Sequence, residues 1–170
     1  MDKFNEILIT FFNIRPLKFF SIYGLVAMIL LMLPSFLFMR KANLTRPADL
    51  DIHSMQTARM ELITRIVLNF TIPLMRMPLY DNVFLYISAG ILVLYYLLWV
   101  RFVIQGSYYP DIYMKTALGI PIPFDILNSL YLIFISIWLC NAISVTIAVI
   151  FAICRIANAM AARKDLLSRV

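Results

Sequence analysis

One apolar run in the chain is too long for the core of a small soluble domain. Ile126 to Cys154 contains 29 consecutive residues without a charge, and a continuous helix over them would measure about 43 Å. A hydrocarbon core is about 30 Å thick, so this helix must tilt, protrude or break. Its most polar central residue is Asn141. We predict one long membrane helix over residues 124–156.

Two further runs have the length of a membrane helix. Phe19–Met39 is uncharged for 21 residues, and Val83–Val100 lies between two charged residues and ends among Tyr and Trp side chains, which favour the headgroup layer. They predict helices over 17–39 and 82–104. With 63% apolar and only 14% charged residues, the composition excludes an ordinary soluble domain. We therefore expect an all-α integral membrane protein.

Residues 60–80 decide the number of membrane helices. The ten residues between Arg65 and Arg76 are uncharged, which is too few to cross a bilayer. On a helical projection one side is apolar, with Leu62, Ile63, Ile66, Val67 and Phe70. The opposite side is polar, with Glu61, Thr64, Arg65 and Asn69. This pattern favours an amphipathic interfacial helix. The alternative is a short fourth crossing or re-entrant hairpin with Arg65 facing protein.

The remaining segments complete a single membrane domain over 1–170. We expect a second amphipathic interfacial helix over 1–15, a polar loop over 40–59, an interfacial loop over 105–123 and a basic tail over 157–170. A bundle of three crossings places ten Lys and Arg on the cytoplasmic side against five, and four crossings place eight against six. Both arrangements put the C-terminus in the cytoplasm. We expect the inner (plasma) membrane of a bacterium as the location.

Small side chains recur every four residues along the longest run. The predicted helix-packing face consists of Ser136, Cys140, Ser144, Ala148 and Ala152. Small residues in such a row let another helix backbone approach closely, within this chain or in a partner. The leading prediction is therefore a non-enzymatic membrane protein that acts through helix–helix contacts with another membrane protein or with a second copy of itself, with the lipid bilayer as its other partner. No nucleic acid is expected.

A second set of residues belongs to one membrane surface, at the loop between the last two predicted membrane helices. These residues, predicted as a polar entrance, are Arg101, Asp111, Lys115 and Asp125. Ionisable residues at a membrane edge can recognise or gate a ligand, so the alternative function is a small transporter or channel component. The Asp49, Asp51 and His53 string is explained by a solvated loop. We find no catalytic motif, and we expect no enzyme activity, cofactor or metal.

The overall build is similar to that of immunity proteins against pore-forming bacteriocins and of small subunits of some solute transporters. The similarity is one of architecture, namely about 170 residues with three or four membrane helices and short basic ends. It implies an accessory or immunity-type role and assigns no function to any particular residue.

Overall fold

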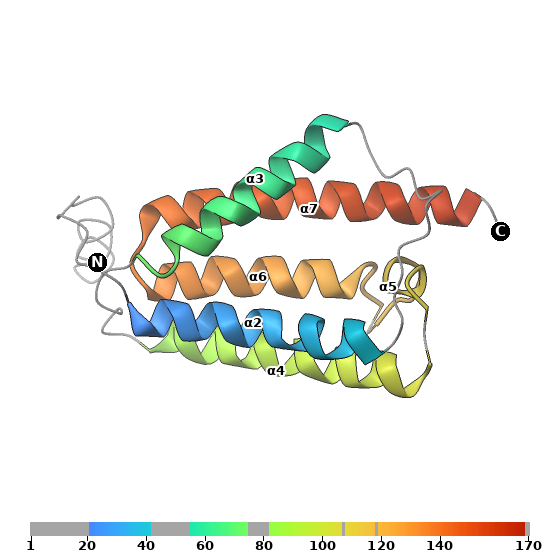
Figure 1. Ribbon diagram of the computed structural model, residues 1–170, viewed down its shortest axis with the longest axis horizontal. Helices are drawn as coiled ribbons and strands as arrows, with labels where there is room; N and C mark the ends of the chain where they lie inside the picture. Colours follow the sequence, from blue (N-terminus) through green and yellow to red (C-terminus); the bar gives the residue numbers. More distant parts are fainter. Residues whose placement is uncertain (1–20, 42–54, 75–81, 107, 118, 169–170) are drawn as a thin grey trace.

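The computed structural model describes residues 21–41, 55–74, 82–106, 108–117 and 119–168, and every regular element among them is a helix (Figure 1). The all-α prediction is thus confirmed. The helices are α2 (Ile22–Lys41), α3 (Met55–Thr71), α4 (Val83–Ile104), α5 (Asp111–Met114), α6 (Pro123–Trp138) and α7 (Ala142–Ser168). The predicted helix over 1–15 and most of the predicted loop over 40–59 lie outside the described residues.

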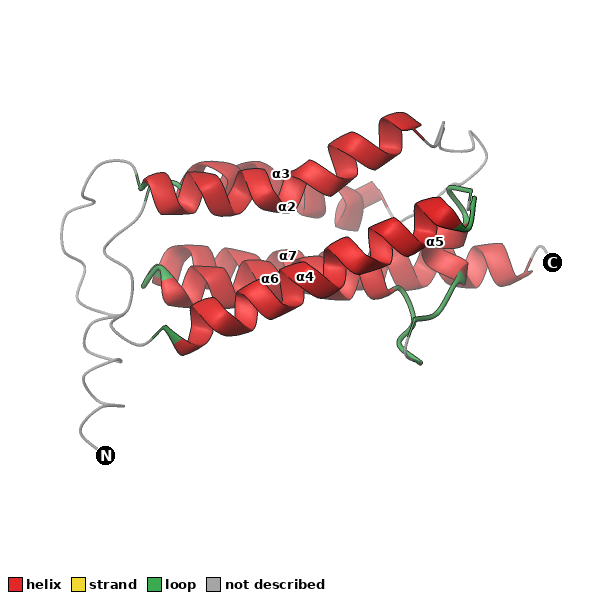
Figure 2. Ribbon diagram, turned by 90° about the horizontal axis from the view of Figure 1, so that it is seen from below, coloured by secondary structure: helices red, strands yellow, loops and turns green. Residues whose placement is uncertain are grey.

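The five long helices run side by side, with α2, α4 and α7 in one direction and α3 and α6 in the other (Figures 1 and 2). Helix α6 is central, because it packs against both α4 and α7. Helix α3 packs against α7, whereas α2 packs against α4. The core between them is rich in aromatic residues, including Tyr95, Trp99, Phe124 and Phe151.

The long helix predicted over 124–156 is not continuous, and this is the main correction to the predicted fold. Helix α6 ends at Trp138 and α7 begins at Ala142, so the run folds back as a hairpin. Cys140 has a left-handed φ of 54° at the turn. The Asn141 carboxamide accepts a hydrogen bond from the Ser144 backbone N–H (3.0 Å) and donates one to the Thr71 carbonyl (3.2 Å). Asn141 therefore caps α7 and ties the turn to α3.

The predicted amphipathic segment forms α3, but its apolar side faces outward. Leu62, Ile63, Ile66 and Phe70 are each about half exposed or more, whereas Thr64 and Leu68 are buried. A soluble protein would bury the apolar side and expose the polar one. The arrangement is the one expected where the outer surroundings are lipid and polar groups face the protein.

Two of the described helices, α4 and α7, are long and apolar enough to cross a membrane. Shorter apolar helices cover Ile22–Leu37 and Pro123–Trp138. Large apolar side chains are exposed along α2, α3, α4 and α7, while α6 exposes only Leu130 among its large apolar residues. The bundle thus has an apolar outer surface around a protein-covered central helix.

Gly24, near the start of α2, lies close to the backbone that follows α3, and substitution of this glycine tests the contact. A Cβ at this position would overlap the Ile72 carbonyl group. We expect Gly24→Ala to lower the free energy of unfolding by about 1–3 kcal/mol, because the backbone has to move. Gly90→Ala on α4 is the control, since a Cβ there meets no other atom within 4 Å, and removing a helical glycine stabilises by about 0.5–1 kcal/mol. Unfolding of both variants in detergent gives the comparison, and equal effects would contradict the close contact.

Candidate functional site

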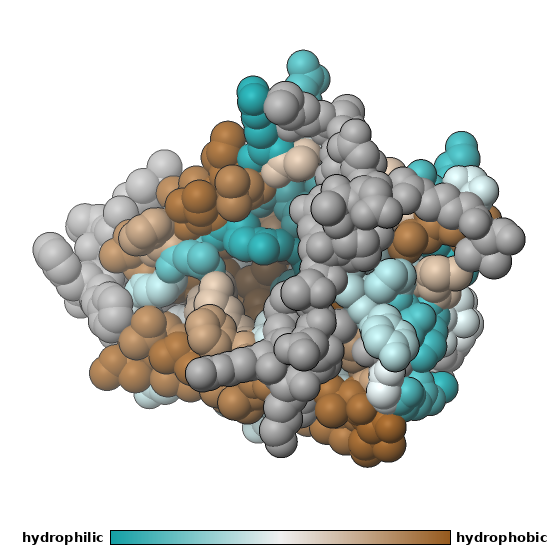
Figure 3. Space-filling model, turned by 45° about the vertical axis from the view of Figure 1, so that its right-hand side comes forward, coloured by the Kyte–Doolittle hydropathy of each residue, from teal (hydrophilic) through white to brown (hydrophobic). Residues whose placement is uncertain are grey.

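A cavity of about 520 Å³ lies between α2 and the group formed by α3, α6 and α7. The face of the molecule in Figure 3 is hollowed, and both hydrophilic and hydrophobic residues are visible in the hollow. One wall of the cavity is apolar and contains Met28, Leu31 and Leu132. The other wall contains charged and amide side chains, which are Glu61, Arg65, Asn69, Asp125, Asn128, Arg155 and Asn158.

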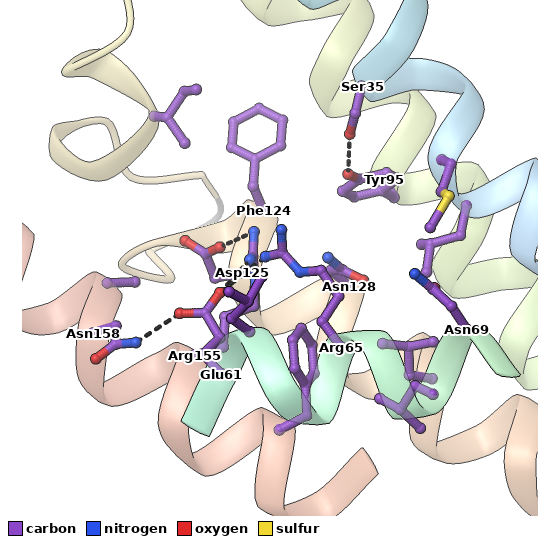
Figure 4. Close-up of a pocket in the computed structure, with 18 of the residues that line it drawn as sticks. Ser35, Glu61, Arg65, Asn69, Tyr95, Phe124, Asp125, Asn128, Arg155 and Asn158 are labelled. Atoms are coloured by element: carbon purple, nitrogen blue, oxygen red, sulfur yellow. Dashed lines mark hydrogen bonds and ion pairs between the residues drawn. The ribbon is translucent and has the colours of Figure 1, made fainter. Parts of the chain in front are cut away.

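Arg155 is at the centre of the polar wall and joins three helices (Figure 4). From α7, its Nη1 lies 2.8 Å from Glu61 Oε1 on α3, and its Nη2 lies 2.7 Å from Asp125 Oδ1 on α6. Both carboxylates are largely buried, with 17% and 5% of their side chains exposed. One guanidinium group thus holds two acidic side chains through charge-assisted hydrogen bonds.

Two more side chains complete this ionic cluster around Glu61. Arg65, one turn further along α3, places Nη2 2.9 Å from Glu61 Oε1, and Asn158 donates a 2.6 Å hydrogen bond to Glu61 Oε2. The two guanidinium groups lie over the Phe151 ring, at 5.8 and 5.7 Å from its centroid. Two Arg and two carboxylates give the ionic cluster of Glu61, Arg65, Asp125 and Arg155 a net charge of zero.

Several polar atoms of the cavity wall remain without a hydrogen-bond partner within the described structure. They are buried and include Asn69 Oδ1, Asp125 Oδ2, Asn128 Oδ1 and Arg155 Nε. Asp125 as a whole is only 3% exposed. Buried polar atoms in proteins almost always have partners, so on this wall the side-chain oxygens can accept hydrogen bonds from a bound molecule and Arg155 Nε can donate one.

Aromatic side chains form the rest of the wall. The Trp99 and Phe124 rings have centroids 5.0 Å apart, and the Tyr95 hydroxyl lies 3.3 Å from Ser35 Oγ on α2. Tyr113 of α5 lies beside Tyr109, with their hydroxyls 3.4 Å apart. Burial and this hydrogen bond raise the pKa of Tyr113 above its ordinary value, so the phenol stays neutral. Neutral aromatic groups close the cavity next to the charges.

The four residues of the predicted polar entrance lie at one end of the bundle, but only one belongs to the cavity wall. Asp125 pairs with Arg155, and not with Arg101, which is exposed on α4. Asp111 and Lys115 form their own pair, at 3.2 Å, one turn apart. The long helix predicted over 124–156 would place Arg155 at the opposite end from Asp125, whereas the hairpin brings the two side chains together.

The site was not predicted, because the favoured interpretation placed Glu61 and Arg65 on an interfacial helix and Arg155 at the far end of one long helix. Only the alternative for residues 60–80 had Arg65 facing protein. One signal was available: Asp125 and Arg155 bound the 29-residue uncharged run, and Cys140 lies midway between them. If the run turns back at its centre, its two charged ends must meet. Nothing in the spacing indicated that Glu61 would join them.

All five residues of the predicted helix-packing face are buried within the chain. Ser136 and Ser144 are fully buried, and Cys140, Ala148 and Ala152 are at most 8% exposed. Ser136 lies on α6, Cys140 in the turn and the other three on α7. The row therefore serves the packing of α7 inside this chain, and it presents no surface to a partner.

No protein-family model, curated protein or solved structure matches this chain. The chemistry of the cavity wall is therefore the basis on which a function can be assigned.

Replacing Arg155 should lower the free energy of unfolding far more than replacing an exposed cation. We expect Arg155→Gln to lower the free energy of unfolding by about 3–5 kcal/mol, because two buried carboxylates lose their shared partner. Lys115→Gln, which breaks the exposed pair with Asp111, should cost no more than about 1 kcal/mol. Adding Glu61→Gln and Asp125→Asn to Arg155→Gln should recover part of the loss. Denaturant unfolding in detergent measures all three, and equal costs for the two single variants would contradict a buried ionic cluster.

Proposed function

We propose that all five long helices lie in the membrane, with the C-terminal end of α7 on the cytoplasmic side. Two observations support this arrangement. Apolar side chains are exposed around the bundle, and the described residues within 21–37, 66–74, 82–100 and 126–154 include no Asp, Glu, Lys or Arg. The described Lys and Arg gather toward the end of the bundle where α7 finishes, which the positive-inside rule assigns to the cytoplasm. Helix α3 is then a short crossing, which was the alternative for residues 60–80, with its apolar side in lipid and Arg65 on the cavity wall.

The hairpin gives this topology a direct test. In a background without Cys140 and Cys154, single cysteines replace the exposed residues Lys115, Ser168 and Val83. We expect a membrane-impermeant maleimide to label Lys115→Cys and Ser168→Cys from the same side, and Val83→Cys from the opposite side. Labelling of the first two from opposite sides would mean that residues 124–156 cross once, against the hairpin.

The function that the cavity supports best is non-catalytic binding of an amphipathic small molecule, as a carrier or transport component of the membrane. The observation that carries this proposal is the juxtaposition of a buried ionic cluster, with unpartnered polar atoms, and an apolar wall in one cavity. Ligand cavities have this character, mostly apolar with a few placed polar groups, and sizes of about 300–1,000 Å³. The proposal keeps the predicted polar entrance but centres it on Asp125 and Arg155.

Contact with another membrane protein stays a prediction. The small-residue row that motivated it is buried inside the chain, and the exposed apolar residues of the outer helices are accounted for by lipid. Ligand binding therefore takes precedence as the proposed role.

Two matched leucine variants on α2 test the cavity as the binding site. Leu31 lines the cavity, whereas Leu33, two residues on, is exposed outside it. Native mass spectrometry of the detergent-purified protein should show one retained amphipathic molecule per chain. Leu31→Phe should lower the bound fraction about tenfold, because an added ring in a packed wall costs more than ~1 kcal/mol, and Leu33→Phe should leave it unchanged. Absence of a retained molecule, or equal effects of the two variants on the bound fraction, would contradict the proposal.

A further inference from the structure

We propose that the molecule held in the cavity is a zwitterionic phospholipid whose headgroup ends in a primary ammonium, as in phosphatidylethanolamine. This inference rests on the proposed function and names the class of its ligand. It follows from four properties of the cavity, which are its charge balance, its buried acceptors, the position of Arg65 and the position of its mouth.

The charge balance favours a ligand without net charge. The ionic cluster is neutral as a whole, because Arg155 pairs with both acidic groups and Arg65 pairs with Glu61. An anion or cation with no internal counter-charge would leave an unbalanced charge in a buried site, which is costly. A zwitterion can place each of its charges against an opposite one and keep the site neutral.

The acceptors favour an N–H donor at the positive end of that zwitterion. Asp125 Oδ2 and Asn128 Oδ1 are buried and have no hydrogen-bond partner among the described residues. They belong to residues three apart on α6, which lie on the same side of the helix. A primary ammonium carries three N–H donors and can satisfy both oxygens. A trimethylammonium group has none and would leave both acceptors unpartnered, at a cost in binding.

Arg65 provides the complementary position for the phosphate. Its side chain lines the cavity, is 46% exposed and uses Nη2 for Glu61. The remaining N–H groups of a guanidinium are well suited to phosphate oxygens. In Figure 4, Arg65 reaches from α3 toward Asp125, Asn128 and Arg155, so a headgroup between them would meet both kinds of partner.

The mouth of the cavity favours a ligand with acyl chains. Its exposed lining residues include Met32 and Phe36 on α2 and Leu62 on α3, which are 41%, 81% and 57% exposed. Because α2 packs against α4 while α3 packs against α7, the mouth between α2 and α3 opens onto the apolar outer surface. A headgroup bound at the ionic cluster would direct its chains through this mouth into the bilayer.

Trp99 supplies a probe inside the cavity. The chain has two Trp residues, and Trp99 lines the cavity whereas Trp138 does not. In the Trp138→Phe variant, lipids brominated on the acyl chain are titrated into detergent-solubilised protein, and quenching of Trp99 fluorescence is followed. We expect saturable quenching by brominated phosphatidylethanolamine at a concentration at least tenfold lower than by phosphatidylcholine or phosphatidylglycerol with the same chains. Trp99→Phe, which keeps Trp138, should show no saturable quenching.

Variants of the cavity wall test the recognition of the ammonium and of the phosphate separately. Asn128→Leu, which removes one acceptor and breaks no ion pair, should reduce the preference for ethanolamine over choline to about twofold. Arg65→Gln should weaken binding of both lipids about tenfold, while Arg59→Gln on the same helix, outside the cavity lining, should leave both unchanged. Helical circular dichroism of each variant checks folding, and the comparison of lipids on Trp138→Phe alone decides the proposal if a wall variant fails to fold.

Failure of this inference is distinguishable from failure of the proposed function. Equal quenching by the three lipids would overturn the headgroup assignment, while a retained amphipathic molecule sensitive to Leu31→Phe would keep the cavity as a binding site. Water-soluble glycerophosphoethanolamine that displaces the brominated lipid at the same concentration as phosphatidylethanolamine would overturn a lipid as the source of the headgroup. Displacement only by the chain-bearing lipid supports it.

Discussion

The contact between Arg155 and its two carboxylates determines how the hydrophobic sequence can be arranged. Asp125 and Arg155 are separated by 29 uncharged residues, and in a continuous helix they would lie about 45 Å apart. Arg155 Nη2 and Asp125 Oδ1 are 2.7 Å apart because the run turns at Leu139–Asn141. Glu61 brings α3 to the same guanidinium. The short turn makes α6 and α7 antiparallel, and the Glu61 contact with Arg155 places the Glu61 side of α3 inward.

Apart from the hairpin, the apolar pattern predicts where the long apolar helices lie in the sequence. It does not predict which side of a helix faces the protein and which faces outward. Uncharged length was sufficient to indicate a helix over 82–104, and the observed α4 covers Val83–Ile104. Periodicity also placed Leu62 and Ile66 on one side of a helix, opposite Glu61 and Arg65. It could not say that the apolar side faces outward, because the same projection fits a helix whether water or lipid lies beyond it.

The hairpin turn escaped prediction because it uses neither glycine nor proline. Cys140 has a left-handed backbone, and so does Ile122 directly before α6. Each such conformation costs of order 1–3 kcal/mol for a residue with a side chain, and local sequence rules therefore do not place turns there. Tertiary contacts stabilise them, namely the Asn141 cap shared with Thr71 and the complete burial of Ile122. The Asn141–Thr71 contact joins residues 70 positions apart in the sequence, so local sequence patterns do not reveal it.

The energetics of the ionic cluster explain why binding is a better account of it than stability. Desolvation of a buried ion pair offsets most of its Coulomb attraction, and well-packed apolar residues often stabilise a fold equally well. An apolar bundle such as this one, with Leu31, Leu132 and Phe151 already around the cavity, could have closed with further apolar residues. Instead it retains four charges, and Asp125 Oδ2 is buried with no partner among the described residues. In the proposed function, a polar molecule that enters the cavity supplies the missing hydrogen bonds, which gives these groups a favourable free energy that the fold alone does not.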